Sequence, residues 1–90
     1  MEYEFDTIKN RINIAKHGIS LTDAGEFDWE TARQHEDTRK SYPERRHTAV
    51  GYLGDRLHVM VLCFRESKIR VISLRKANAR EVKIYGTSKT

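Results

Sequence analysis

The most constraining feature of this sequence is an apolar run from Arg56 to Arg65. Hydrophobic side chains occupy both sets of alternating positions in this run, and alternate side chains of a β-strand point to opposite faces of its sheet. A strand that is apolar on both faces is typical of the centre of a sheet. Two turn-forming residues, Glu66 and Ser67, separate the run from residues 68–75, which are rich in β-branched side chains. The two segments therefore predict a β-hairpin whose first strand is central.

A helix is predicted immediately after this hairpin. Asn78, with Glu81 three residues later, is the sequence signature of a helix N-terminus, because each side chain can bond the backbone N–H of the other residue. Apolar residues follow at helical spacing, namely Ala79, Val82 and Tyr85. Basic residues are spread through the hairpin and this helix, so the sheet and the helix start together indicate a surface for an anion.

Further elements are predicted before the central strand. Residues 47–53 have strand character, and Gly54-Asp55 is a favourable two-residue turn into the central strand. Residues 31–37 are polar and ambiguous, with an edge strand as one interpretation. Residues 38–45 contain the only proline and show no periodicity, which indicates a loop.

The N-terminal segment predicts a short strand and two short helices. Residues 1–5 are the candidate strand, and Asp6 is a suitable N-cap for a helix that ends at Gly18 after two basic residues. This helix would carry one apolar face, formed by Ile8, Ile12 and Ala15. Ser20 opens a second helix with an apolar stripe, and aromatic residues then close the core. The residues concerned are Leu21, Ala24, Phe27 and Trp29.

These elements predict an α+β fold in a single domain, residues 1–90, with a small core. The helices come first, a three- or four-stranded antiparallel meander follows, and a final helix comes last. We expect the helices to cover one face of the sheet, which leaves the other face or its edge for charged groups.

The charged residues are unevenly distributed along the chain, and this distribution is more informative about partners than the net charge of +4. Residues 1–45 contain seven Lys/Arg and ten Asp/Glu, whereas residues 46–90 contain ten and three. The positive charge is thus concentrated in the hairpin and the final helix, which favours a phosphate-bearing or acidic partner. A solvated basic surface with no such partner is the alternative.

Several function classes find little support in the sequence. The four histidines lack metal-binding spacing, and the single cysteine, Cys63, is interpreted as a small buried hydrophobe, so no cofactor is expected. No apolar run approaches membrane-spanning length, and the N-terminus lacks a signal-peptide pattern. We therefore expect a cytoplasmic protein with no membrane partner.

The candidate functional residues are mainly arginines. Arg75 lies where the last strand gives way to the helix, and Arg80 lies in the first turn of that helix. A forked guanidinium group suits phosphate oxygens, and a helix N-terminus attracts the same anions. Strict alternation along the strand places Arg70 and Arg75 on opposite faces of the sheet. His17 and Glu44 are the candidates for proton transfer.

Two segments carry a resemblance to a known family, KHGIS at 16–20 and RVISLRKA at 70–77. Further matching residues are Tyr3, Glu4, Phe5, Asp6, Leu21, Ala24, Phe27, Glu44, Arg45, Arg46, Gly51, Arg80, Glu81 and Tyr85. With these residues the sequence resembles BrnT-type toxins, small ribonucleases of the RelE-like superfamily from bacterial type II toxin–antitoxin systems. The stretch between Trp29 and Pro43 departs from the family by being shorter and less acidic.

The resemblance implies a RelE-like fold and a metal-independent endoribonuclease that inhibits translation and growth. A ribose 2′-OH would attack its own phosphodiester, so the main requirement is to stabilise charge at phosphorus. The residues implied in catalysis are His17, Glu44, Arg46, Arg75 and Arg80, with Tyr42 and Tyr85 as outside candidates. His17 is the first choice for proton transfer and Glu44 the second. The residues implied in RNA binding are Lys16, Arg65, Arg70 and Lys76.

The partner implied by the resemblance is a BrnA-type ribbon-helix-helix antitoxin. The antitoxin would bind DNA, and the toxin would be bound to DNA only indirectly, through the antitoxin. An acidic, partly disordered segment of such a partner would suit the basic face of this chain. The ribosome is a further candidate partner. Two other classes fit the composition: a non-catalytic basic nucleic-acid-binding module, and a regulatory subunit whose basic surface serves only an acidic partner. Only the toxin is expected to cleave RNA, so an RNA-cleavage assay distinguishes it from the other two classes.

Overall fold

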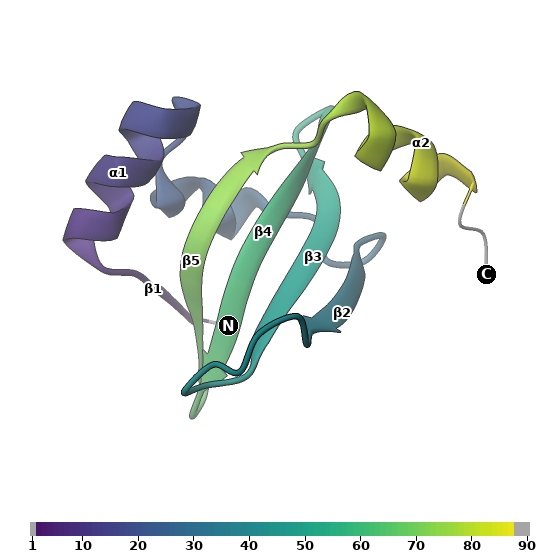
Figure 1. Cartoon of the computed structure of the whole chain (residues 1–90). Helices are drawn as coiled ribbons and strands as arrows, with labels where there is room; N and C mark the ends of the chain where they lie inside the picture. The colour runs from purple at the N-terminus through teal and green to yellow at the C-terminus, as the bar shows by residue number, and fades with distance from the viewer. Residues whose placement is uncertain (1, 88–90) are drawn as a thin grey trace.

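The computed structural model describes residues 2–87 and shows an α+β fold (Figure 1). Its elements are β1 (Glu2–Glu4), α1 (Thr7–His17), the 3₁₀ helix η1 (Leu21–Glu26), β2 (Arg33–Asp37), β3 (Arg46–Leu53), β4 (Arg56–Arg65), β5 (Lys68–Lys76) and α2 (Ala79–Thr87). The strands form one sheet in the order β1-β5-β4-β3-β2, so β4 is central as the sequence predicted. The antiparallel meander runs from β2 to β5, and β1 extends it by pairing parallel to β5.

Apolar side chains pack on both faces of the sheet. The main core contains Ile19, Leu21, Ala24, Phe27, Ala49, Met60, Leu62, Ile69, Val71 and Leu74. A smaller cluster on the other face contains Leu57, Val59 and Ala77, with Val50 and Tyr85 packed against it. The central strand contributes to both clusters, which explains its two apolar phases. Because α2 adds Tyr85 to the smaller cluster, the expectation that all helices cover one face was wrong.

The local signals for turns and helix ends are confirmed. Asp6 caps the N-terminus of α1, and Gly18 ends that helix at φ 71°, a backbone conformation that favours glycine. Gly54 adopts φ 68° in the two-residue turn between β3 and β4. Asn78 and Glu81 form the expected capping box, in which each side chain accepts the backbone N–H of the other residue at 2.8–2.9 Å.

The buried face of α1 differs from the one that hydrophobicity predicts. The expected apolar face is exposed, including Ile8, Ile12 and Ala15. Asn13 is buried instead, with 4% of its surface exposed. Its amide nitrogen donates to the carbonyls of Ile19 (2.9 Å) and Leu74 (2.8 Å), and its amide oxygen accepts the Leu74 N–H (3.1 Å). The prediction failed because a fully bonded amide fixes the rotation of the helix.

A β-bulge in β5 changes which arginines share a face. The register between β4 and β5 shifts by one residue and leaves Ile72 without a partner in β4. Arg70 pairs with Cys63 and Arg75 pairs with Val59. Those two residues of β4 lie on the same face, since they are an even number of positions apart. Arg70 and Arg75 therefore share one face, and the prediction of opposite faces was wrong.

We expect Asn13→Ala to lower the free energy of unfolding by about 2–4 kcal/mol, because three hydrogen bonds are lost and buried backbone groups are left without partners. Ile12→Ala, on the exposed face of the same helix, should change it by less than about 1 kcal/mol. Urea denaturation followed by circular dichroism measures both values. A larger loss for Ile12→Ala than for Asn13→Ala would contradict the observed rotation of α1.

Candidate functional site

A cavity of about 570 Å³ lies on the face of the sheet opposite the main core. Its apolar part is formed by β3 and β4, with Val50, Val59 and Val61 beside Thr48. Charged and aromatic side chains from β2, the following loop, β5 and α2 complete the lining, among them Arg33, His35, Asp37, Arg39, Arg75, Glu81 and Tyr85. The cavity thus combines an apolar surface with several guanidinium groups.

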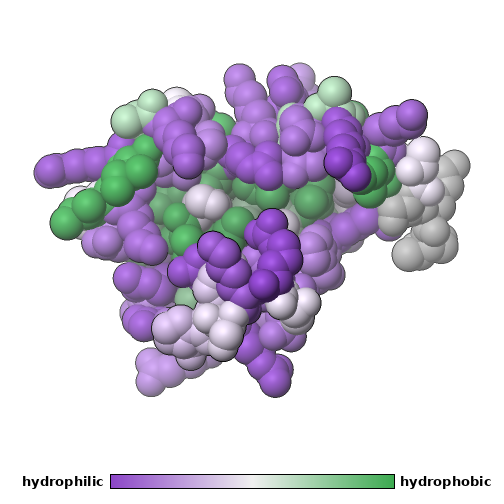
Figure 2. All heavy atoms as spheres, viewed as in Figure 1, coloured by the Kyte–Doolittle hydropathy of each residue, from purple (hydrophilic) through white to green (hydrophobic). Residues whose placement is uncertain are grey.

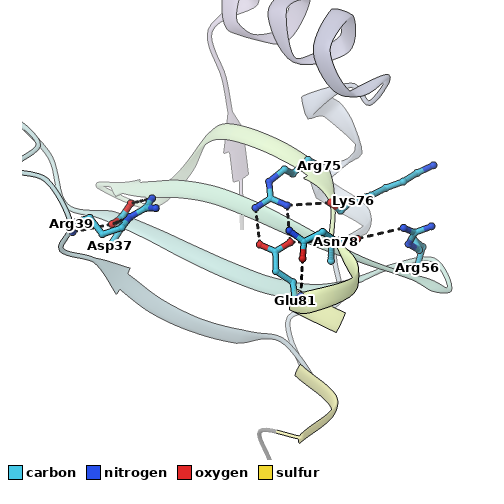
Figure 3. Close-up of polar contacts among 8 residues, drawn as sticks. Asp37, Arg39, Arg56, Arg75, Lys76, Asn78 and Glu81 are labelled. Carbon is cyan, nitrogen blue, oxygen red and sulfur yellow. Dashed lines mark hydrogen bonds and ion pairs between the residues drawn. The ribbon is translucent and has the colours of Figure 1, made fainter. Parts of the chain in front are cut away.

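Arg75 is held in this cavity by Glu81 (Figure 3). Two guanidinium nitrogens of Arg75 donate to the two carboxylate oxygens of Glu81, each at 2.8 Å. The same carboxylate accepts the Asn78 N–H, so a single acid fixes both the arginine and the start of α2. The bonds from Arg75 hold the pKa of Glu81 below its ordinary value of 4.5, and the Asn78 N–H lowers that pKa further.

A second bidentate ion pair joins Asp37 to Arg39, beside β2 in Figure 3. Both contacts measure 2.9 Å, and the carboxylate also accepts the Arg39 backbone N–H and the Tyr42 hydroxyl. Hydrogen bonds from Arg39 hold the pKa of Asp37 well below its usual range. This carboxylate is therefore charged at neutral pH and fixes the loop that follows β2.

Arg33 of β2 and Tyr85 of α2 contact each other in the lining of the cavity. The Arg33 guanidinium carbon lies 5.0 Å from the centre of the Tyr85 ring, a cation–π contact. The Tyr85 hydroxyl donates to the Thr31 carbonyl at 2.7 Å, which fixes the ring. Within residues 2–87, the buried Arg33 Nε has no hydrogen-bond partner. An unpaired buried donor carries an energetic cost.

The three predicted arginines do not line one common cavity. Arg75 lines it, whereas Arg46 and Arg80 do not. Arg46 lies opposite Asp37 in the pairing of β2 with β3, and its guanidinium stacks 4.3 Å from the centre of the Tyr42 ring. Arg80 is exposed on the first turn of α2. Arg46 therefore lies beside Asp37, which lines the cavity, and Arg80 directly precedes Glu81, which also lines it.

Glu44, Arg65 and Arg70 belong to a separate ion-pair network. Arg65 binds Glu44 through two contacts of 2.9 and 3.0 Å, and Arg70 binds Glu4 at 3.0 Å. Arg65 also lies 4.0 Å from Glu4. Hydrogen bonds from Arg65 lower the pKa of Glu44. The network neutralises part of the basic hairpin with acids from the first half of the chain.

The remaining predicted residues lie outside the cavity. His17 is half-buried at the end of α1, where burial lowers its pKa and the positive charges of Lys16 and Arg75 lower it further. This direction favours a neutral imidazole at pH 7. Lys16 and Lys76 are exposed.

Three basic residues of the cavity were absent from the predicted set: Arg33, His35 and Arg39. The alternation of Arg33, His35 and Asp37 along an edge strand was a usable signal, because it places all three on one face. Only the pairing of β2 with β3 brings these residues to the valines of the cavity.

Among residues 2–87, no group of three His, Cys, Asp or Glu side chains is close enough to hold a metal ion. No helix in that part of the chain is long and apolar enough to cross a membrane.

Comparison with known proteins identifies one family. A family model described as "Ribonuclease toxin, BrnT, of type II toxin-antitoxin system" matches residues 5–81. The match runs from the residue before the cap of α1 to Glu81 in the first turn of α2, so it includes the four strands of the meander. No curated protein matches the chain.

Glu81→Gln should lower the free energy of unfolding by about 1–2 kcal/mol at pH 7, because a neutral amide loses the charge-assisted bonds to Arg75. Folding lowers the pKa of Glu81, so its stabilisation is complete above the ordinary value of 4.5 and is lost as the pH falls through the folded-state pKa. Urea denaturation should therefore show a smaller difference from wild type at pH 3 than at pH 7.

The matched control is Glu66→Gln, which removes an exposed carboxylate from the turn between β4 and β5. It should change stability by less than about 0.5 kcal/mol at either pH. A Glu81→Gln effect that is the same at pH 3 and pH 7 would show that the charge on Glu81 is not what stabilises the fold.

Proposed function

The chain belongs to the BrnT family of ribonuclease toxins of type II toxin–antitoxin systems, and from this we propose that it is an endoribonuclease that cleaves RNA without a metal ion, in the cavity on the sheet. The observation that carries the proposal is the gathering of Arg33, Arg39 and Arg75 around an apolar surface. This combination suits a phosphodiester with its neighbouring sugar and base. Cleavage of cellular RNA would inhibit translation and growth.

In the proposed reaction the ribose 2′-oxygen attacks the adjacent phosphorus. The new 2′-O–P bond forms as the P–O5′ bond breaks, which leaves a 2′,3′-cyclic phosphate and a 5′-hydroxyl. A general base takes the proton of the 2′-OH, and a general acid gives a proton to the leaving 5′-oxygen. The phosphoryl oxygens gain negative charge in the transition state, and preorganised guanidinium groups stabilise it.

Arg75 is the proposed main stabiliser of this charge. Its bonds to Glu81 hold the guanidinium plane before substrate arrives, so little reorganisation is needed. Arg33 lines the same cavity, which supports a second phosphate contact there. Arg46 and Arg80 are proposed to contact the RNA backbone outside the cavity, because they do not line it. The same proposal covers the other predicted RNA-binding residues, Lys16, Arg65, Arg70 and Lys76.

Proton transfer is proposed for a histidine. The lowered pKa of His17 supports it as a base, since a neutral imidazole can accept a proton. His35 lines the cavity where RNA is proposed to bind and His17 does not, which favours His35 over His17. Glu44 is a weaker candidate, because Arg65 already occupies both of its carboxylate oxygens.

The proposed partner is a BrnA-type ribbon-helix-helix antitoxin. An acidic segment that covers the cavity would exclude RNA without any change in the toxin fold. DNA binding would then belong to the antitoxin alone, and the toxin would reach DNA only as part of the complex.

Purified protein should cleave single-stranded RNA in excess EDTA and leave 2′,3′-cyclic phosphate and 5′-hydroxyl ends. Gel electrophoresis detects the cleavage, and mass spectrometry of the fragments identifies the ends. Loss of cleavage in EDTA would contradict the metal-free reaction. Salt-sensitive RNA binding without any cleavage would instead favour a non-catalytic nucleic-acid-binding module.

Arg75→Ala should lower the cleavage rate by about 10²–10³-fold, the usual effect of removing one donor to a developing oxyanion. Lys68→Ala is the matched control, because it removes a cation from the same strand outside the cavity. Urea denaturation must show that both variants are folded at the assay temperature. Equal rates for the two folded variants would remove Arg75 from the catalytic site.

A further inference from the structure

The helix α1 exposes an apolar stripe to solvent. Ile8 and Ile12 are 65% and 58% exposed, and Ala15 continues the line. The three residues are spaced four and three positions apart, so they lie on one face of the helix. Figure 2 shows hydrophobic atoms on the left surface of the molecule, where Figure 1 places α1. Exposed apolar residues that are contiguous, rather than scattered, mark interaction sites.

Two asparagines prevent this stripe from turning inward. Asn13 bonds to the backbone of Leu74 in β5, as described above. Asn10 accepts the Leu21 N–H at 2.7 Å and lies 3.4 Å from the Ser20 hydroxyl. These contacts fix the rotation of α1 about its own axis. The exposure of the isoleucines is therefore a property of the folded domain.

Cations flank the stripe on both sides. Arg11 lies on one side of it, and Lys9 and Lys16 lie on the other, as the helical repeat requires. Thr7–His17 contains no acidic residue. Two copies of this chain meeting through α1 would bring like charges together, which disfavours self-association. An acidic partner is favoured for the same reason.

We propose that this stripe docks an amphipathic helix of the antitoxin, one whose apolar face is flanked by Asp or Glu. This inference rests on the proposed function, because it requires an antitoxin partner. Apolar side chains of the partner would pack between Ile8 and Ile12, and its carboxylates would pair with Lys9 and Arg11. The stripe contains no aromatic residue, whereas helices that lie on membranes use Trp, Phe and Leu, so a protein occupant is favoured over a lipid surface.

The docking site and the RNA cavity lie on different faces of the sheet. α1 is bonded to Leu74 of the main core, and the cavity includes Val59 and Val61 of the opposite face. An antitoxin helix on α1 would therefore anchor the partner without entering the cavity. Neutralisation would need a second segment of the same antitoxin.

The test measures binding of the purified antitoxin encoded with this toxin, by isothermal titration calorimetry. The double variant Ile8→Ser/Ile12→Ser should bind it at least about tenfold more weakly, and Lys9→Glu/Arg11→Glu should do the same. Ile14→Ser is the matched control, because Ile14 is 45% exposed on the same helix but off the stripe. It should bind within about twofold of wild type.

RNA cleavage by the free toxin separates this inference from the proposed function. The Ile8→Ser/Ile12→Ser variant should cleave RNA at the wild-type rate, since neither residue belongs to the proposed catalytic or RNA-binding set and its charge is unchanged. Wild-type affinity of the Ile8→Ser/Ile12→Ser variant for antitoxin, with cleavage intact, would overturn the docking site alone. Absence of cleavage by the wild-type protein would overturn the proposed function instead.

Two other occupants give distinct results that would also overturn the inference. A lipid surface would appear as sedimentation of the wild-type protein with phosphatidylserine-containing vesicles that the Ile8→Ser/Ile12→Ser change abolishes, with antitoxin affinity unchanged. A second copy of the chain would appear as a wild-type dimer in analytical ultracentrifugation that becomes monomeric with the same change.

Discussion

The side-chain amide of Asn13 fixes how α1 packs against the sheet. β1 pairs with β5 only at Lys68, Ile69 and Arg70, so no residue of β1 lies beside Leu74. The Asn13 amide donates to the Leu74 carbonyl and accepts its N–H, as a neighbouring strand would. This bonding attaches α1 to β5 while Leu74 points into the main core. The next residue, Arg75, must then project from the opposite face, where the cavity lies.

The sequence predicts features that nearby residues determine and misses those that distant residues determine. The caps at Asp6 and Gly18 and the box at Asn78 depend on contacts within a few positions, and all were predicted. Asn13 is buried because of a partner 61 residues away, which no helical periodicity reveals. The bulge at Ile72 likewise exists only relative to β4, so alternation alone gave the wrong faces for the arginines. Arg75 was recognisable from its position at a strand end, whereas Arg33 joins it only through the pairing of β2 with β3.

Basic residues are concentrated in the second half of the sequence, but several of them form ion pairs within the domain. Arg65 and Arg70 are bound by Glu44 and Glu4 from the first half, and Arg75 is bound by Glu81. A phosphate that reaches Arg75 meets a guanidinium already oriented by a carboxylate. The ion pairs thus reduce the net positive charge but hold the guanidinium groups in fixed orientations. Preorganised donors of this kind are what stabilises a charged transition state.

The same pairing bears on how a partner would gain its affinity. Within the cavity, Glu81 and Asp37 already neutralise Arg75 and Arg39 in part, so an acidic segment placed there would gain less from charge pairing than one placed on unpaired cations. The cations Lys9, Arg11 and Lys16 of α1 take part in none of the ion pairs formed among the described residues, and the isoleucines beside them are exposed to water. A partner that covers α1 would gain apolar burial and new charge pairs together. The proposed antitoxin would therefore gain most of its affinity by binding α1, and it would inhibit the toxin by covering the cavity. The two contacts would lie on opposite faces of the sheet.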